Sequence, residues 1–76
     1  LSYKDVHALE TLPKEIDALE AAITKNELRL TDMDFFAKDP AAYQGVADKI
    51  AQDKQTLADK EEAWLEVEMK KEALEG

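Results

Sequence analysis

The sequence predicts an all-α fold, an antiparallel two-helix coiled-coil hairpin with a kink or short extra helix before Pro13. Two series of mainly apolar residues repeat with alternating steps of three and four, which is the spacing of a coiled-coil seam. Because Asp39-Pro40 separates the two series, we expect them to pair within one chain. The first series is Leu9, Leu12, Ile16, Leu19, Ile23, Asn26, Leu30 and Met33, and the second is Tyr43, Val46, Ile50, Asp53, Leu57, Lys60, Trp64, Val67, Lys71 and Leu74.

The first half of the hairpin is expected to consist of two segments, because proline lacks an N–H and disfavours helix in the residue before it. We expect a lead-in and a short helix over residues 1–12, then a longer helix over residues 13–32 that begins with Pro13 in its first turn. Leu9 and Leu12 keep the seam register of the residues that follow. The two segments are therefore expected to be nearly collinear, with a kink between them.

Residues 33–39 form the predicted turn, and the second helix is predicted over residues 40–74. In the turn, Phe35 and Phe36 are expected to fold back and close the end of the seam, although aromatic residues in a loop also anchor partners. Asp39-Pro40 is a strong helix start, since the carboxylate caps free N–H groups and proline suits the first helical position.

Antiparallel pairing about this turn predicts that facing residues have numbers that add up to about 76. Leu12 then faces Trp64, and we expect Trp64 in the core rather than as an anchor for a partner. Asn26, Asp53 and Lys60 interrupt the apolar series. We interpret them as polar contacts that set the register, with the Lys60 ammonium reaching towards water.

The chain offers little for catalysis. With 76 residues and no cysteine, it allows one domain, residues 1–76, without disulfides, thiolate metal sites or cysteine nucleophiles. Gly45 and Gly76 are too few for a phosphate-binding loop, and His7 is interpreted as a surface residue. The acidic pairs lack the spacing of a calcium loop. We predict no catalytic residue, no metal site and no cofactor in this chain.

The chain begins at Leu1, without a basic leader region and without an apolar run near the ~18 residues of a membrane span. We therefore expect a fragment of a longer cytoplasmic protein, with no membrane contact. Because the two series match each other about a single turn, we expect this fragment to be a monomer.

Charge is distributed unevenly along the proposed hairpin. The net charge of −8 argues against a general affinity for phosphate backbones. Residues 25–54, however, carry five cations against six carboxylates, whereas the rest of the chain carries five against twelve. Solvation of helix faces is the simpler interpretation of these charges. The candidate nucleic-acid contacts are the five cations nearest the turn, Lys25, Arg29, Lys38, Lys49 and Lys54.

Four short motifs occur in a specific order, LSYK at residues 1–4, LPKEI at 12–16, DP at 39–40 after two phenylalanines, and WLEVE at 64–68. Together they resemble the C-terminal domain of Uup-type ABC-F ATP-binding proteins. The resemblance implies an antiparallel coiled coil that follows two ABC ATPase cassettes and is associated with DNA binding. It also implies a soluble cytoplasmic parent that binds ATP and Mg and is linked to ribosome function and DNA transactions.

We therefore expect a noncatalytic C-terminal domain of an ABC-F type ATPase that contributes nucleic-acid binding, to DNA or structured RNA, through its turn end. The alternative is a protein–protein interaction or dimerisation coiled coil with no nucleic-acid contact. The net acidity favours this alternative.

Overall fold

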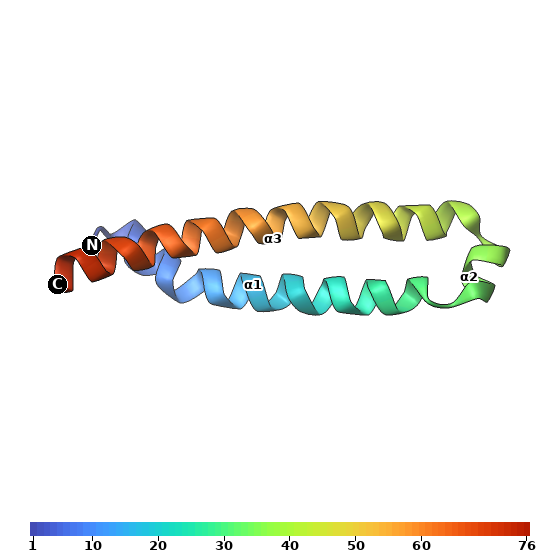
Figure 1. Ribbon diagram of the computed structural model, residues 1–76, viewed down its shortest axis with the longest axis horizontal. Coiled ribbons are helices and arrows are strands. Elements are labelled where there is room, and N and C mark those ends of the chain that lie inside the picture. Colours follow the sequence, from blue (N-terminus) through green and yellow to red (C-terminus); the bar gives the residue numbers. More distant parts are fainter.

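The computed structural model describes residues 1–76 and contains three helices and no strand. Helix α1 spans Tyr3–Leu30, α2 spans Met33–Lys38 and α3 spans Pro40–Glu75. The two long helices lie side by side in opposite directions and α2 lies in the turn between them (Figure 1). The molecule measures 56 × 17 × 14 Å, with both termini at one end, the open end, and α2 at the other, the turn end. The predicted antiparallel helical hairpin is confirmed.

Each helix begins at a side-chain cap. Ser2, Asp32 and Asp39 each accept a hydrogen bond from a backbone N–H two or three residues further on, at 3.0 to 3.2 Å. Pro40 follows in the first turn of α3, where its missing N–H leaves no hydrogen bond unmade. The predicted start of the second helix at Asp39-Pro40 is therefore confirmed.

Helix α1 does not break at its proline. It is continuous over Tyr3–Leu30 with Pro13 inside it, so the predicted division into residues 1–12 and 13–32 is wrong. An internal proline removes one backbone hydrogen bond and presses on the carbonyl group of Leu9, which bends a helix that packing holds together. Figure 1 shows this bend, beyond which the N-terminal part of α1 crosses α3. The predicted kink is confirmed.

An aromatic cluster closes the seam at the turn end. Within Met33–Lys38, which forms helix α2 in place of an irregular turn, Phe35 and Phe36 both pack against Tyr43 of α3. Their ring centroids lie 5.7 and 5.0 Å from the Tyr43 ring, and the Tyr43 hydroxyl donates a hydrogen bond to the Leu30 carbonyl oxygen at 3.2 Å. The predicted closure of the seam by the two phenylalanines is confirmed.

The core is a narrow line of side chains between α1 and α3. Most residues of the two predicted series are buried or half-buried, including the polar ones. Only five residues in the molecule are buried, and all five belong to this seam. These five are Leu12, Ile23, Ile50, Asp53 and Val67.

Three residues assigned to the seam are exposed, and their predicted burial is wrong. Met33 is 75% exposed because α1 has already ended, and Leu74 is 69% exposed because it lies in the last turn of α3. Trp64 is 36% exposed. Leu12, its predicted partner, is buried and lines a pocket with Ala63 and Val67 of α3 rather than with Trp64.

Ion pairs across the seam report the helix register. Glu15 of α1 lies 2.8 Å from the Lys60 ammonium, and Asp5 lies 3.8 Å from that of Lys70. In these two pairs the residue numbers add up to 75, close to the predicted value of about 76, whereas in the third pair between the two helices, Glu27 with Lys54, they add up to 81. The Lys60 side chain extends from the seam to the edge of the helix pair, where its ammonium meets the Glu15 carboxylate and the side chain stays partly exposed.

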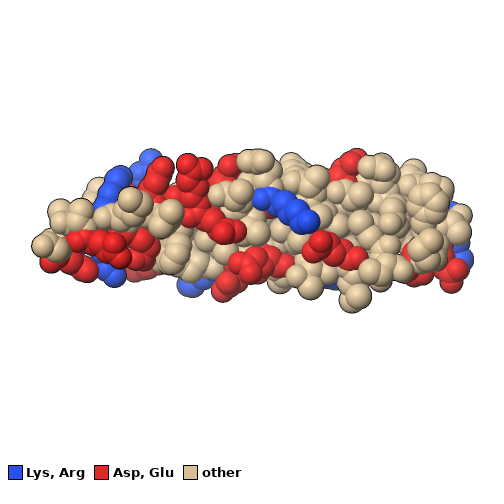
Figure 2. Space-filling model, viewed as in Figure 1, with Lys and Arg blue, Asp and Glu red and all other residues tan.

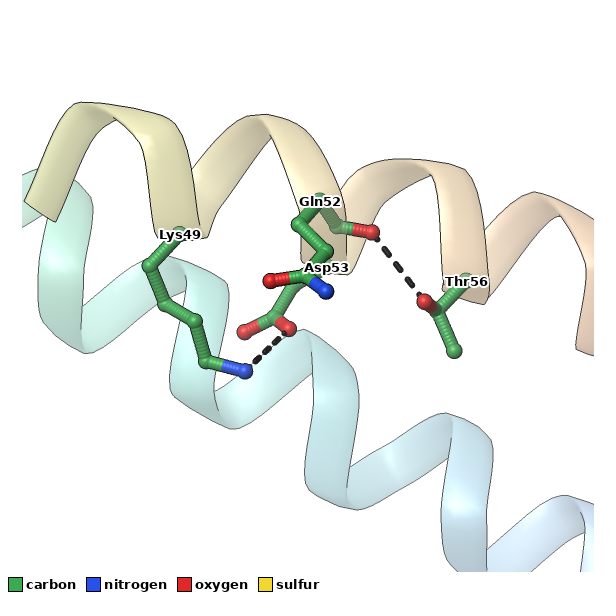
Figure 3. A network of polar contacts seen from close by, with 4 residues as sticks. All are labelled: Lys49, Gln52, Asp53 and Thr56. Atoms are coloured by element: carbon green, nitrogen blue, oxygen red, sulfur yellow. Dashed lines mark hydrogen bonds and ion pairs between the residues drawn. The ribbon is translucent and has the colours of Figure 1, made fainter. Parts of the chain in front are cut away.

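Asp53 is the one buried charged residue. Its carboxylate accepts a hydrogen bond from the Lys49 ammonium at 2.9 Å, one helical turn earlier on α3. Figure 3 shows the Lys49 side chain reaching towards α1 to meet Asp53, whereas the Thr56 hydroxyl donates a hydrogen bond to the backbone carbonyl oxygen of Gln52 on another side of α3. The buried carboxylate thus has a partner, as a charge removed from water requires.

Ile50→Ala should lower the free energy of unfolding by about 2 to 5 kcal/mol, because it leaves a cavity in a seam that has few other buried groups. Met33→Ala is the matched control, since Met33 is mostly exposed and should change stability little. Urea unfolding followed by circular dichroism measures both. Similar losses for the two variants would contradict the described core.

Gly45→Ala should raise the free energy of unfolding by about 1 kcal/mol, because glycine is that much less favourable than alanine inside a helix. A Cβ atom at this position meets nothing within 4 Å, so no clash opposes the gain. Ala51→Gly, the reverse change at an exposed position of the same helix, should lower stability by a similar amount. Thermal melting of both variants tests the sign, and a destabilised Gly45→Ala protein would show that this part of α3 is packed differently.

Lys49→Ala should lower stability by about 1 to 3 kcal/mol, because it leaves the buried Asp53 carboxylate without its partner. Asp53→Leu should leave stability unchanged or raise it, since an apolar side chain then fills the seam. In the Asp53→Leu background, Lys49→Ala should have little effect. Chemical denaturation of the four proteins forms a double-mutant cycle, and equal effects of Lys49→Ala in both backgrounds would show that the two groups do not interact.

Candidate nucleic-acid interface

The five candidate contact residues are all exposed, but they do not form one patch. Lys49 and Lys54 lie five residues apart on α3, which places them about 140° apart around the helix. Asp53, the partner of Lys49, is in the seam, whereas Lys54 meets Glu27 of α1 on the outside. A flat polyanion therefore cannot meet both lysines at once without bending around α3.

Two of the candidate cations already have carboxylate partners. The Lys49 ammonium lies 2.9 Å from Asp53, and the Lys54 ammonium lies 3.5 Å from Glu27. Both lysine side chains are more than half exposed, but only in the Lys54 pair is the carboxylate exposed too, so only that pair stabilises the fold slightly. At each position a phosphate has to compete with a carboxylate. Lys49 and Lys54 are therefore the weaker members of the predicted set.

Arg29 and Lys38 come together in an open groove at the turn end. The groove runs between the last turn of α1 and helix α2, and both residues line it together with Phe35. The Arg29 guanidinium carbon lies 5.2 Å from the centroid of the Phe35 ring, a cation–π contact that holds the arginine over the turn. Lys25 lies one turn before Arg29 on the same side of α1. The ion pairs of the molecule include none of these three cations.

The groove is close to electrically neutral. Asp32 and Asp34 line it with the two cations, and the Asp32 carboxylate is engaged in capping α2. Carboxylates gather instead over the open half of the molecule, on the left in Figure 2, and the turn half of the same face is mostly uncharged. A phosphate group thus meets less repulsion at the turn end than elsewhere along the hairpin.

The molecule holds no group of three or more His, Cys, Asp or Glu side chains that could bind a metal ion. None of its helices combines the length and the apolar character needed to cross a lipid bilayer.

Residues 1–69 match the family model of the ABC transporter C-terminal domain. The chain belongs to this family. No curated protein and no solved structure matches it. The resemblance to a C-terminal domain of ABC proteins is thereby confirmed, and the matched range contains the four motifs and all five candidate cations.

Sequence reasoning missed the groove of this ABC C-terminal domain. Arg29 and Lys38 lie nine residues apart on two different helices, so no periodicity relates them. The available signal was the Phe35 ring between them in sequence, because an arginine near an aromatic side chain often stacks on it. The orientation of α2 decides whether the three side chains meet.

Proposed function

We propose that this ABC C-terminal domain is a noncatalytic arm that contacts the phosphate groups of nucleic acid, DNA or structured RNA, with its turn end. The main support for the proposal is the groove that Arg29 and Lys38 line together with Phe35. Lys25 lies one turn before Arg29 on α1. Exposed cations bind phosphates without a deep pocket, and arginine suits phosphate geometry. The exposed Phe36 ring adds a face on which an unpaired base can stack.

The shape of the hairpin supports this role. A C-terminal domain follows the other domains of its protein, so the open end, where Leu1 lies, is proposed to adjoin the ATPase cassettes. The turn end then projects by up to the 56 Å length of the molecule. In this arrangement ATP and Mg bind to the cassettes of a cytoplasmic parent protein, and the acidic open end keeps a polyanion away from the base of the arm.

A protein-interaction or dimerisation coiled coil without nucleic-acid contact is the second candidate. The net charge of −8 favours it, because this charge lowers the affinity for any polyanion. Exposed apolar side chains on α3 also favour it, since such groups commonly mark protein contacts.

Replacing Lys25, Arg29 and Lys38 together with glutamine should abolish binding to a labelled DNA or RNA duplex at low salt. Each phosphate contact that is lost should also reduce the slope of log affinity against log salt by about 0.9. Fluorescence anisotropy at two or more salt concentrations measures both effects. The double change Lys49→Gln and Lys54→Gln should weaken binding less, because carboxylates already neutralise these two lysines.

The matched control is the triple change Lys4→Gln, Lys14→Gln and Lys71→Gln. It removes the same charge from the open end, again from lysines that make no ion pair, and should leave affinity almost unchanged. Equal losses in the two triple variants would show that net charge rather than the turn end determines binding. Absence of wild-type binding at low salt would reject the nucleic-acid proposal and leave the protein-interaction candidate.

A further inference from the structure

An exposed apolar surface lies on the C-terminal half of α3, far from the groove of Arg29. Trp64, Leu65 and Met69 expose 36%, 55% and 60% of their surfaces. Leu65 and Met69 are one helical turn apart and form a continuous ridge. Beside this ridge, Trp64 and Leu65 line an open groove together with Ile16 of α1. We call this the Trp64 groove.

The rim of the Trp64 groove is acidic. Glu20 of α1 and Glu61 and Glu62 of α3 line it, and none of the three takes part in an ion pair within the chain. No lysine or arginine lines the groove. Three carboxylates that lack a cationic partner therefore surround a strip of apolar side chains, within the half of the molecule that has five cations against twelve carboxylates.

Apolar side chains surrounded by carboxylates determine which kind of molecule can bind in the Trp64 groove. Nucleic acids and anionic lipid surfaces are repelled by the rim. A second copy of the chain seated on the same surface would bring six carboxylates together without a compensating cation. Repulsion between these like charges disfavours such a contact. A partner that carries both apolar side chains and positive charges can cover the apolar side chains of the Trp64 groove and pair with the carboxylates of its rim.

We propose that the Trp64 groove binds a basic amphipathic helix of another protein. Its apolar side chains cover Trp64, Leu65 and Met69, and its lysine and arginine side chains meet the three glutamates of the rim. Insertion of an amphipathic helix into an apolar groove is a recurring mode of recognition, and an arginine also fits over the exposed indole ring. The proposed nucleic-acid contact lies at the turn end, so the two contacts are independent.

Trp64 is the only tryptophan of the chain, so its fluorescence reports directly on the groove. The probe is a synthetic amphipathic helix of leucine, lysine and arginine, and the control peptide keeps the leucines and carries glutamate at every basic position. The basic peptide should produce a saturable change in Trp64 fluorescence that weakens with added salt, and the acidic peptide should produce none. Equal binding of both peptides would overturn the proposal.

Leu65→Ser should lower the affinity for the basic peptide about tenfold, and the double change Glu61→Gln and Glu62→Gln should have an effect of similar size. Leu74→Ser is the matched control, since Leu74 is exposed on the same helix but lies outside the groove. Circular dichroism verifies that each variant is folded. Wild-type affinity in folded Leu65→Ser protein would overturn the proposal. Self-association of the wild type that Leu65→Ser abolishes would assign the groove to a second copy and also overturn it.

Discussion

The apolar seam between α1 and α3 is the constraint on which the rest of the molecule depends. Only five residues are buried, and most of the stability of a helix in a protein comes from packing, so each long helix is stable because the other covers one side of it. A seam this narrow leaves polar groups at its edges, and the pairs of Asp53 with Lys49 and of Glu15 with Lys60 satisfy them. Because the whole interior is the seam, any function has to use the faces and ends of the hairpin.

The two ends of the hairpin differ in their chemistry. At the turn end, the aromatic cluster around Tyr43 closes the seam and presents Arg29 beside a lysine with little net charge. At the open end, glutamates surround the partly exposed Trp64. An anion is therefore repelled least at the turn end, whereas a cation is attracted to the acidic half of a rod 56 Å long. The two proposed contacts, a polyanion at the turn end and a basic protein segment at the Trp64 groove, therefore use separate parts of this small ABC C-terminal domain.

Pro13 links local backbone chemistry to the packing of the open end. A proline inside a helix removes one hydrogen bond and bends the axis, and the bend carries the N-terminal turns of α1 across α3. Asp5 thereby reaches Lys70, and Leu12 packs near Val67. Trp64, on the same part of α3, is partly exposed and lines the Trp64 groove.

The sequence by itself determined the helical hairpin, its register, the start of α3 at Asp39-Pro40 and the aromatic closure of the turn. These features follow from periodicity, capping and proline placement, which act between near neighbours in the chain. Only the tertiary structure decided that α1 continues through Pro13, that Trp64 is partly exposed, and that Arg29 shares a groove with Lys38. Packing against α3 outweighs the local penalty of the proline, and contacts between helices depend on how each helix is rotated and bent, which near-neighbour patterns do not specify.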